Sequence, residues 1–275
     1  MIQPLNGKAR TEDGCILSYR MHAQKGKPRL ALVHSLALDA TIWKQVAAEL
    51  QADFEILTYD LRGHGQSERR PEPYSARLFA SDLATVLDDC GWAGSIVAGC
   101  SLGGTVAQAF AAAYTARTLA LGLIDTTAWY GPDAVDDWRR RAQRAVEMGF
   151  AAMLPFQLGR WFSDGFREAH PDVVKNISSV FTANDMTCYQ ASCALLGSED
   201  LRTNLQAIRV PVSVIAGEED FATPLYMSQA LHAGIPGSTL TVIPGGRHLT
   251  PVEYPKEIAW LLGKLSRQMS ASAGD

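Results

Sequence analysis

The sequence predicts an α/β protein with a mostly parallel central sheet, flanked by helices and interrupted by one helical insertion. Short apolar runs typical of strands alternate with helix-like segments up to residue 125, and the alternation returns from residue 209. Between them, residues 126–208 contain no clear strand and are typical of several helices broken at Gly and Pro. We therefore predict a core of residues 1–125 and 209–275 and a helical cap, or lid, of residues 126–208.

Each element follows from the spacing of its apolar residues. Strands buried on both faces are near-continuous apolar runs, whereas helices repeat apolar residues every three to four positions. The first strand follows a turn at Asp13-Gly14, and the first helix places Ile42, Val46 and Leu50 on one side. In chain order, the predicted strands are 15–22, 29–34, 54–59, 95–100, 119–125, 210–217 and 238–244, and the predicted helices outside the cap are 41–50, 75–89, 101–114, 224–233 and 253–268.

Composition excludes several classes of protein. The chain has 275 residues, is 47% hydrophobic and carries a formal net charge of -4, so neither nucleic acid nor an anionic membrane is an expected partner. No stretch approaches the roughly 20 apolar residues of a membrane span. The N-terminal stretch "MIQPLNGKARTEDGC" lacks the pattern of an export signal. The five cysteines form no C-x-x-C pair, so we expect free thiols and a cytoplasmic location.

Three polar residues follow predicted strands at the sheet edge where reactive groups collect. Ser101 follows "SIVAGC", Asp220 follows "VSVIAG", and His248 follows "LTVIPGG". The order Ser, Asp, His is that of hydrolases with a nucleophile on a sharp strand-to-helix turn. A lone G-x-S-x-G often occurs by chance in a Gly-rich chain. The interpretation of Ser101 as a nucleophile therefore depends on the Asp and His that follow later strands. We predict that Ser101 is the nucleophile, His248 its base, and Asp220 the acid that orients the histidine.

The surroundings of these residues carry further predictions. Backbone N–H groups must stabilise a developing oxyanion, and we choose those of Leu36 and Leu102. Asp125, at the end of "LALGLID", is the alternative third member, and Glu218 and Glu219 are weaker alternatives.

Five stretches together resemble the α/β-hydrolase superfamily over nearly the whole chain. They are "LVHSLALDATIW", "YDLRGHGQSE", "GCSLGG", "GEEDFATP" and "GGRHLTPVEYP". Within that superfamily the chain is most similar to the 3-oxoadipate enol-lactonases, on "WRRRAQRAVEMG", "GRWFSDGF", "VFTANDMTCYQASC" and "EDLR". Those lactonases usually carry Asn-Ser-Leu-Gly where this chain has His34-Ser35-Leu36-Ala37. The resemblance implies hydrolysis of a small ester or lactone in aromatic catabolism.

An enol-lactone substrate of this kind carries a carboxylate, so a cation is expected in the pocket. Trp138 and Arg141 fall on one predicted helical face, and we predict that they contact the substrate. The alternative is that the arginines around them form a solvated basic face.

Other activities on the same fold stay open. They are hydrolysis of a C–C bond or an amide, cofactor-free dioxygenation, and a small-molecule receptor. The sequence contains neither a P-loop nor G-x-G-x-x-G, so we expect no cofactor and no metal. The expected partner is a small ester or lactone, and self-association is left open.

Overall fold

One sheet with strand order β1-β2-β4-β3-β5-β6-β7-β8 forms the centre of the molecule. The structure, a computed structural model, describes residues 4–22 and 24–272. Residues 1–3, part of the stretch read for an export signal, lie outside the described residues, as do 23 and 273–275. The strands are β1 (Leu5–Arg10), β2 (Ile16–His22), β3 (Arg29–Val33), β4 (Glu55–Tyr59), β5 (Ser95–Cys100), β6 (Thr118–Ile124), β7 (Val212–Gly217) and β8 (Thr239–Ile243).

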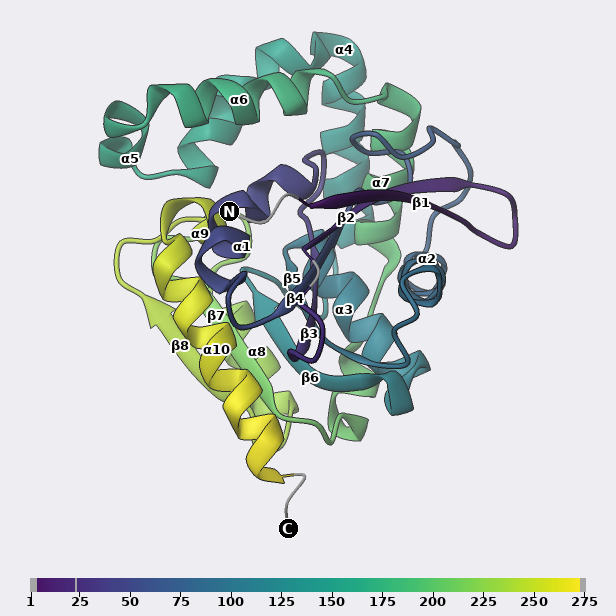
Figure 1. Cartoon of the computed structure of the whole chain (residues 1–275). Coiled ribbons are helices and arrows are strands. Elements are labelled where there is room, and N and C mark those ends of the chain that lie inside the picture. The colour runs from purple at the N-terminus through teal and green to yellow at the C-terminus, as the bar shows by residue number, and fades with distance from the viewer. Residues whose placement is uncertain (1–3, 23, 273–275) are drawn as a thin grey trace.

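The predicted mostly parallel sheet is confirmed. Strands β4, β3, β5, β6, β7 and β8 pair in parallel, and β1 and β2 pair antiparallel at one edge. Every residue of β5 and of β7 is buried, as expected for central strands with helices on both faces. The carboxyl ends of β5, β6 and β7 therefore meet along one edge of the sheet (Figure 1).

Helices cover both faces of the sheet. On one face, α1 (Lys44–Leu50) packs against α10 (Pro255–Ser272), with α9 (Thr250–Glu253) beside them. On the other, α2 (Ala76–Asp89) packs against α3 (Leu102–Ala113), and α8 (Leu225–Gly234) lies on β7. Figure 1 shows α1 and α10 on the opposite side of the strands from α2 and α3. The short helices η1 (Ala40–Trp43), η2 (Thr115–Arg117) and η3 (Arg202–Ala207) connect the larger elements.

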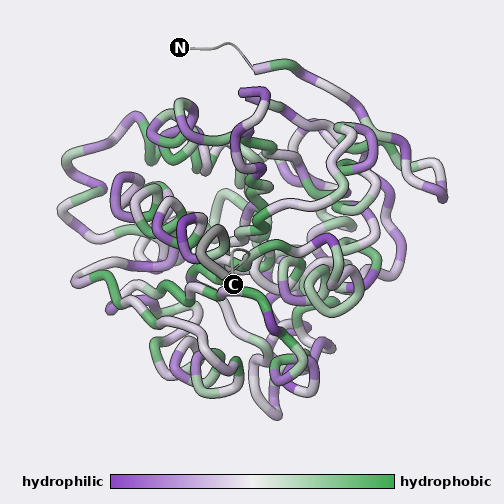
Figure 2. The backbone as a smooth tube through the Cα atoms, turned by 60° about the horizontal axis from the view of Figure 1, so that its bottom comes forward, coloured by the Kyte–Doolittle hydropathy of each residue, from purple (hydrophilic) through white to green (hydrophobic). Residues whose placement is uncertain are grey.

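The segment between β6 and β7 forms a separate helical layer. It contains α4 (Ala134–Trp161), α5 (Asp164–Ala169), α6 (Pro171–Thr182) and α7 (Met186–Ser198), which we call the cap helices. They lie over the carboxyl edge of the sheet (Figure 1). Gly149 interrupts α4 with φ 74° and ψ 158°, so the helix bends there, as predicted for a segment broken at glycine. The hydropathy view shows green apolar stretches gathered toward the middle and purple polar stretches on outer turns (Figure 2).

Three elements differ from their predicted form. Strand β1 was not predicted, because LNGKAR is mostly exposed and has no apolar run. The predicted helix 41–50 begins as η1, where the Asp39 side chain accepts a hydrogen bond from the Thr41 N–H, and continues as α1. The predicted helix 253–268 is divided at Tyr254, because Pro255 starts α10. Within the described residues, no helix is long and apolar enough to cross a membrane.

Candidate active site

Ser101 occupies a sharp turn between β5 and α3. Its backbone has φ 55° and ψ -118°, a conformation that L-residues rarely adopt. Hydrogen bonds fix this turn: the Ser101 N–H donates to the Ile124 carbonyl at 3.0 Å, and the Ser101 carbonyl accepts from Thr126 Oγ1 at 2.7 Å. The first residue after the turn, Leu102, starts α3, so its N–H is one of those without a partner inside the helix.

Two glycines make this turn sterically possible. A Cβ at Gly99 would lie 2.0 Å from the Gly103 carbonyl oxygen, and a Cβ at Gly103 would lie 2.1 Å from the Val33 carbonyl oxygen. Both contacts are with backbone, which cannot rotate away as a side chain can. The glycines of the G-x-S-x-G pattern are therefore required by close packing of β3, β5 and α3.

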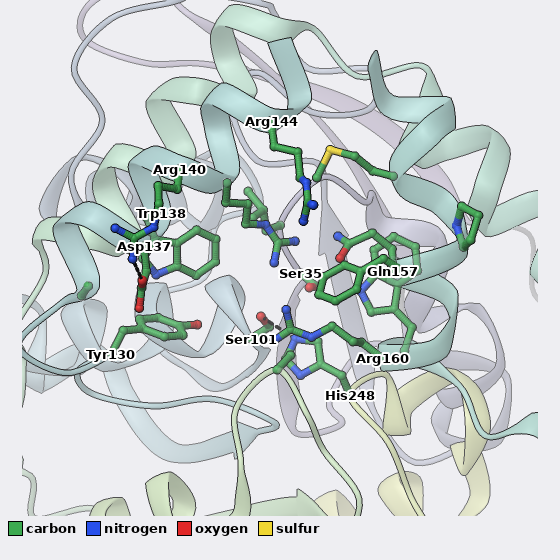
Figure 3. Close-up of a pocket in the computed structure, with 18 of the residues that line it drawn as sticks. Ser35, Ser101, Tyr130, Asp137, Trp138, Arg140, Arg144, Gln157, Arg160 and His248 are labelled. Carbon is green, nitrogen blue, oxygen red and sulfur yellow. Dashed lines mark hydrogen bonds and ion pairs between the residues drawn. The ribbon is translucent and has the colours of Figure 1, made fainter. Parts of the chain in front are cut away.

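The structure brings Ser101, His248 and Asp220 into one hydrogen-bonded chain. His248 Nδ1 lies 2.8 Å from Asp220 Oδ2. His248 Nε2 lies 2.9 Å from Ser101 Oγ, and Figure 3 shows these two side chains next to one another. Because the carboxylate can only accept, Nδ1 carries the proton, and Nε2 is left to accept the hydroxyl hydrogen of Ser101. All three side chains are buried, with residue exposures of 3–5%.

Asp220 is held by donors other than the histidine. The N–H groups of Ala222 and Thr223 donate to Oδ1 at 2.7 and 2.9 Å, and the Thr223 hydroxyl donates to Oδ2 at 2.6 Å. Burial acts to raise the pKa of Asp220, but the charge of His248 and these hydrogen bonds outweigh it and hold the pKa below its usual value. The carboxyl group therefore stays ionised beside the imidazole.

The alternative carboxylates are engaged elsewhere. Asp125 accepts hydrogen bonds from the Gly217 N–H and from the N–H and hydroxyl of Thr250, and burial raises its pKa well above the usual value. Glu218 accepts from the Gly245 N–H, and Glu219 pairs with Arg247 at 3.6 Å. Geometry thus places Asp220 beside His248 in preference to the other three.

The loop after β3 approaches Ser101 from the other side. Leu36 lines the same cavity as Ser101, and Ala37 has φ 57°, in the left-handed region that favours glycine. His34 fixes the start of this loop, because its Nε2 accepts from the Leu61 N–H at 2.9 Å and its Nδ1–H donates to the Ser35 carbonyl at 2.8 Å. The cap contributes as well, since Asn184 Nδ2 donates to the Ala37 carbonyl at 2.7 Å.

A cavity of about 940 Å³ opens above Ser101 and His248, under α4 (Figure 3). Both predicted contact residues of the cap line it. The Arg141 guanidinium lies 5.0 Å from the centre of the Trp138 ring, and its Nε donates to the Tyr189 hydroxyl at 2.9 Å. Arg140 and Arg144 also line the cavity, so part of the arginine run faces the pocket as well as solvent.

Three other residues that line the cavity were not singled out from the sequence. Tyr130 follows β6, and Figure 3 shows its hydroxyl directed toward Ser101. Gln157 and Arg160 come from the second half of α4. In the sequence, Gln157 could have been noticed as a single amide within the apolar stretch MLPFQLGRW. In the structure it is only 1% exposed. Within the described part of the chain, no group of three or more His, Cys, Asp or Glu side chains is arranged to hold a metal ion.

Comparisons with known proteins agree with the observed fold. A model of the alpha/beta hydrolase family matches residues 30–259. The chain is 31% identical over 246 residues to 3-oxoadipate enol-lactonase 2 of Acinetobacter baylyi, covering 90% of this chain and 91% of that protein. It superposes on the enol-lactonase of Burkholderia xenovorans LB400 with a TM-score of 0.90 at 28% identity, covering 95% and 100% of the chains. A hydrolase from Pseudomonas aeruginosa gives 0.89 at 30% identity, covering 94% and 97%.

The histidine pair beside the β3 loop predicts acid destabilisation. The rings of His34 and His64 lie 5.3 Å apart, and burial lowers their pKa values to about 4 and about 3. Below about pH 6.5 the unfolded chain binds protons at both rings while the folded chain does not, so stability falls as the pH decreases. Each ring adds up to about 1.4 kcal/mol per pH unit to this slope.

Urea unfolding between pH 8 and pH 4.5 measures this effect. His64→Asn keeps a side-chain donor but removes one titrating ring, so the pH dependence should lose the slope of one proton. At pH 8 both rings are neutral in both states. Any difference in the free energy of unfolding between variant and wild type at that pH therefore comes from the substitution itself and not from titration. A variant with the wild-type slope would contradict the assignment.

Proposed function

The chain belongs to the α/β-hydrolase family, and from this premise we propose that it is a cofactor-free serine hydrolase of an enol-lactone or similar small ester that carries a carboxylate. The observation that carries the proposal is the chain of hydrogen bonds from Asp220 through His248 to Ser101 at the base of an arginine-lined cavity. We further propose that residues 126–208 are the cap that shapes this cavity, and that residues 1–125 and 209–275 form the core.

Acylation depends on the direction of the hydrogen bonds that link Ser101, His248 and Asp220. As Ser101 Oγ forms a bond to the substrate carbonyl carbon, His248 Nε2 takes the hydroxyl proton, and Asp220 stabilises the imidazolium that results. The negative charge that develops on the carbonyl oxygen meets the N–H groups of Leu36 and Leu102. The C–O bond of the lactone ring then breaks, and the proton held by His248 passes to the leaving enolate oxygen.

Deacylation repeats these steps with water. His248 removes a proton from water, the hydroxide oxygen bonds to the acyl carbon, and Ser101 leaves with the returned proton. An enol is less basic than an ordinary alkoxide and relaxes to a ketone, so the ring-opened product does not return to the lactone. The site thus needs no metal or redox group for either half of the reaction.

The substrate carboxylate is assigned to Arg141 and Trp138. Arg141 is fixed by Tyr189 through Nε, which leaves its two terminal nitrogens for a bidentate contact. The apolar faces of Trp138 and Tyr130, whose rings lie 5.1 Å apart at 84°, form a wall beside it. Two of the relatives, from Acinetobacter baylyi and Burkholderia xenovorans, are enol-lactonases, which supports this substrate class.

A substrate panel tests the proposed reaction. An enol-lactone that carries a carboxylate should be hydrolysed faster than 4-nitrophenyl butyrate, because Arg141 binds its carboxylate. It should be hydrolysed much faster than the matching anilide, because an enolate is a far better leaving group than an anilide anion. Ser101→Ala should abolish turnover of all three. Retention of activity by Ser101→Ala would contradict the mechanism, whereas oxygen uptake, faster anilide cleavage or C–C cleavage would favour the other activities left open by the sequence.

The role of Asp220 gives a second prediction. Asp220→Asn should lower kcat by on the order of 10⁴-fold, because an amide donor toward Nδ1 stabilises the wrong histidine tautomer. Glu218→Gln and Glu219→Gln are the matched controls on the same loop, and each should keep kcat within a few-fold. Steady-state kinetics on one ester measures all three, and a large loss in a control with little loss in Asp220→Asn would reassign the acid.

The role of Arg141 gives a third prediction. Arg141→Ala should raise KM for an anionic ester by about 10- to 100-fold, the loss expected for a charge-assisted hydrogen-bond pair, and change KM for a neutral ester only a few-fold. Arg139→Ala is the control, because the Arg139 side chain is exposed and pairs with Asp136. Equal effects on both esters would show that Arg141 supports the cap and does not bind a carboxylate.

A further inference from the structure

Two donors on residues that line the cavity have no partner among the described residues. Gln157 Nε2 and Arg160 Nε are both buried, and neither forms a hydrogen bond with any described residue. Both side chains line the cavity above Ser101. A buried donor without an acceptor destabilises the folded protein, so an acceptor supplied by a ligand is the simplest explanation for a pair of them.

These donors come from a different part of α4 than Arg141. The bend at Gly149 divides α4, with Arg141 and Trp138 on its first half and Gln157 and Arg160 on its second. Arg160 is anchored near the reacting groups: its Nη2 donates to the Phe221 carbonyl at 2.7 Å, and its own carbonyl accepts from the His248 N–H at 3.3 Å. In Figure 3 its side chain reaches over His248 and Ser101.

The cavity has more positive charge than the protein compensates. Among the described residues, no carboxylate lies within ion-pair distance of Arg141, Arg144 or Arg160. The acidic residue that lines the cavity, Asp137, pairs with Arg140. Burial, and then the charge of Arg141, lower the pKa of Arg160. Guanidinium groups that repel one another in a partly buried space are stabilised by anionic ligands.

We propose that the substrate carries two carboxylates, one bound by Arg141 beside Trp138 and the second bound by Gln157 and Arg160. This inference rests on the proposed function and narrows its substrate class from a monoanionic to a dianionic ester or lactone. The amide of Gln157 and the guanidinium of Arg160 donate to the second carboxylate from one side, near the scissile carbonyl. A volume of about 940 Å³ accommodates a branched acid of this size.

Three activated esters with matched leaving groups test this inference. They are 4-nitrophenyl butyrate, which is neutral, the mono-4-nitrophenyl ester of glutarate, which is a monoanion, and that of propane-1,2,3-tricarboxylate, which is a dianion. The wild type should give a kcat/KM for the dianion at least tenfold above that for the monoanion. Gln157→Met and Arg160→Met should each lower this ratio at least tenfold.

Matched controls lie on the exposed face of α4. Gln143, which bonds to Glu147, and Arg139, which pairs with Asp136, are replaced by methionine in the same way, and both variants should keep the wild-type ratio. Equal rates for monoanion and dianion would overturn the inference. Equal losses on all three esters in Gln157→Met and Arg160→Met would also overturn it, because they would show that these residues serve the reacting carbonyl.

A binding measurement separates this inference from the proposed reaction. Calorimetry on Ser101→Ala should show propane-1,2,3-tricarboxylate, the product of the dianionic ester, binding at least tenfold more tightly than glutarate, and Gln157→Met in that background should remove the difference. This preference would stand even if no ester were hydrolysed, which would reject the proposed function alone. Equal affinity for the two acids would reject the second carboxylate site alone.

Discussion

Ser101 adopts φ 55° because β5 passes directly into α3 without a connecting loop, and the remaining parts of the site depend on that turn. A neighbouring strand holds the turn on each side. On one side β3 packs so closely that Gly103 has no room for a Cβ, and on the other the Ile124 carbonyl of β6 accepts a hydrogen bond from the Ser101 N–H. The strained turn is therefore stable only in the middle of a sheet, where both neighbours are fixed by ladder hydrogen bonds.

The same sheet brings His248 and Asp220 to the turn. Strand β7 pairs with β6, and β8 pairs with β7, so the loops after β7 and β8 open at the edge where β5 ends. Ser101, Asp220 and His248 are far apart along the chain, but the parallel pairing of β5 to β8 brings the carboxyl ends of these strands to one edge. Asp125 lies at the same edge but has a structural role. Its carboxyl group accepts hydrogen bonds from Gly217 at the end of β7 and from Thr250 at the start of α9, and so links these two elements.

Sequence reasoning located these core elements because their signals are local. The alternation of apolar runs with helical spacing predicted seven of the strands to within about two residues. Ser101 stands directly after one of them, and Asp220 and His248 stand in the loops that follow two others. Other features depend on contacts between distant segments. Strand β1 has no apolar pattern and exists because β2 offers it a partner. Gln157 and Arg160 face the cavity because α4 bends at Gly149, a geometry that helical spacing along a straight segment does not predict.

The unpartnered donor of Gln157 and the uncompensated charge of Arg160 make the cap less stable than it could be. An apolar side chain in place of Gln157, or a carboxylate opposite Arg160, would remove an unpartnered donor or an uncompensated charge without disturbing α4. The core shows the alternative: the buried Arg62 guanidinium is surrounded by Asp13, Glu72 and Asp82. Where a cation holds the fold together, this protein supplies its counterions, and where cations face the cavity above Ser101, the anion has to arrive with the ligand.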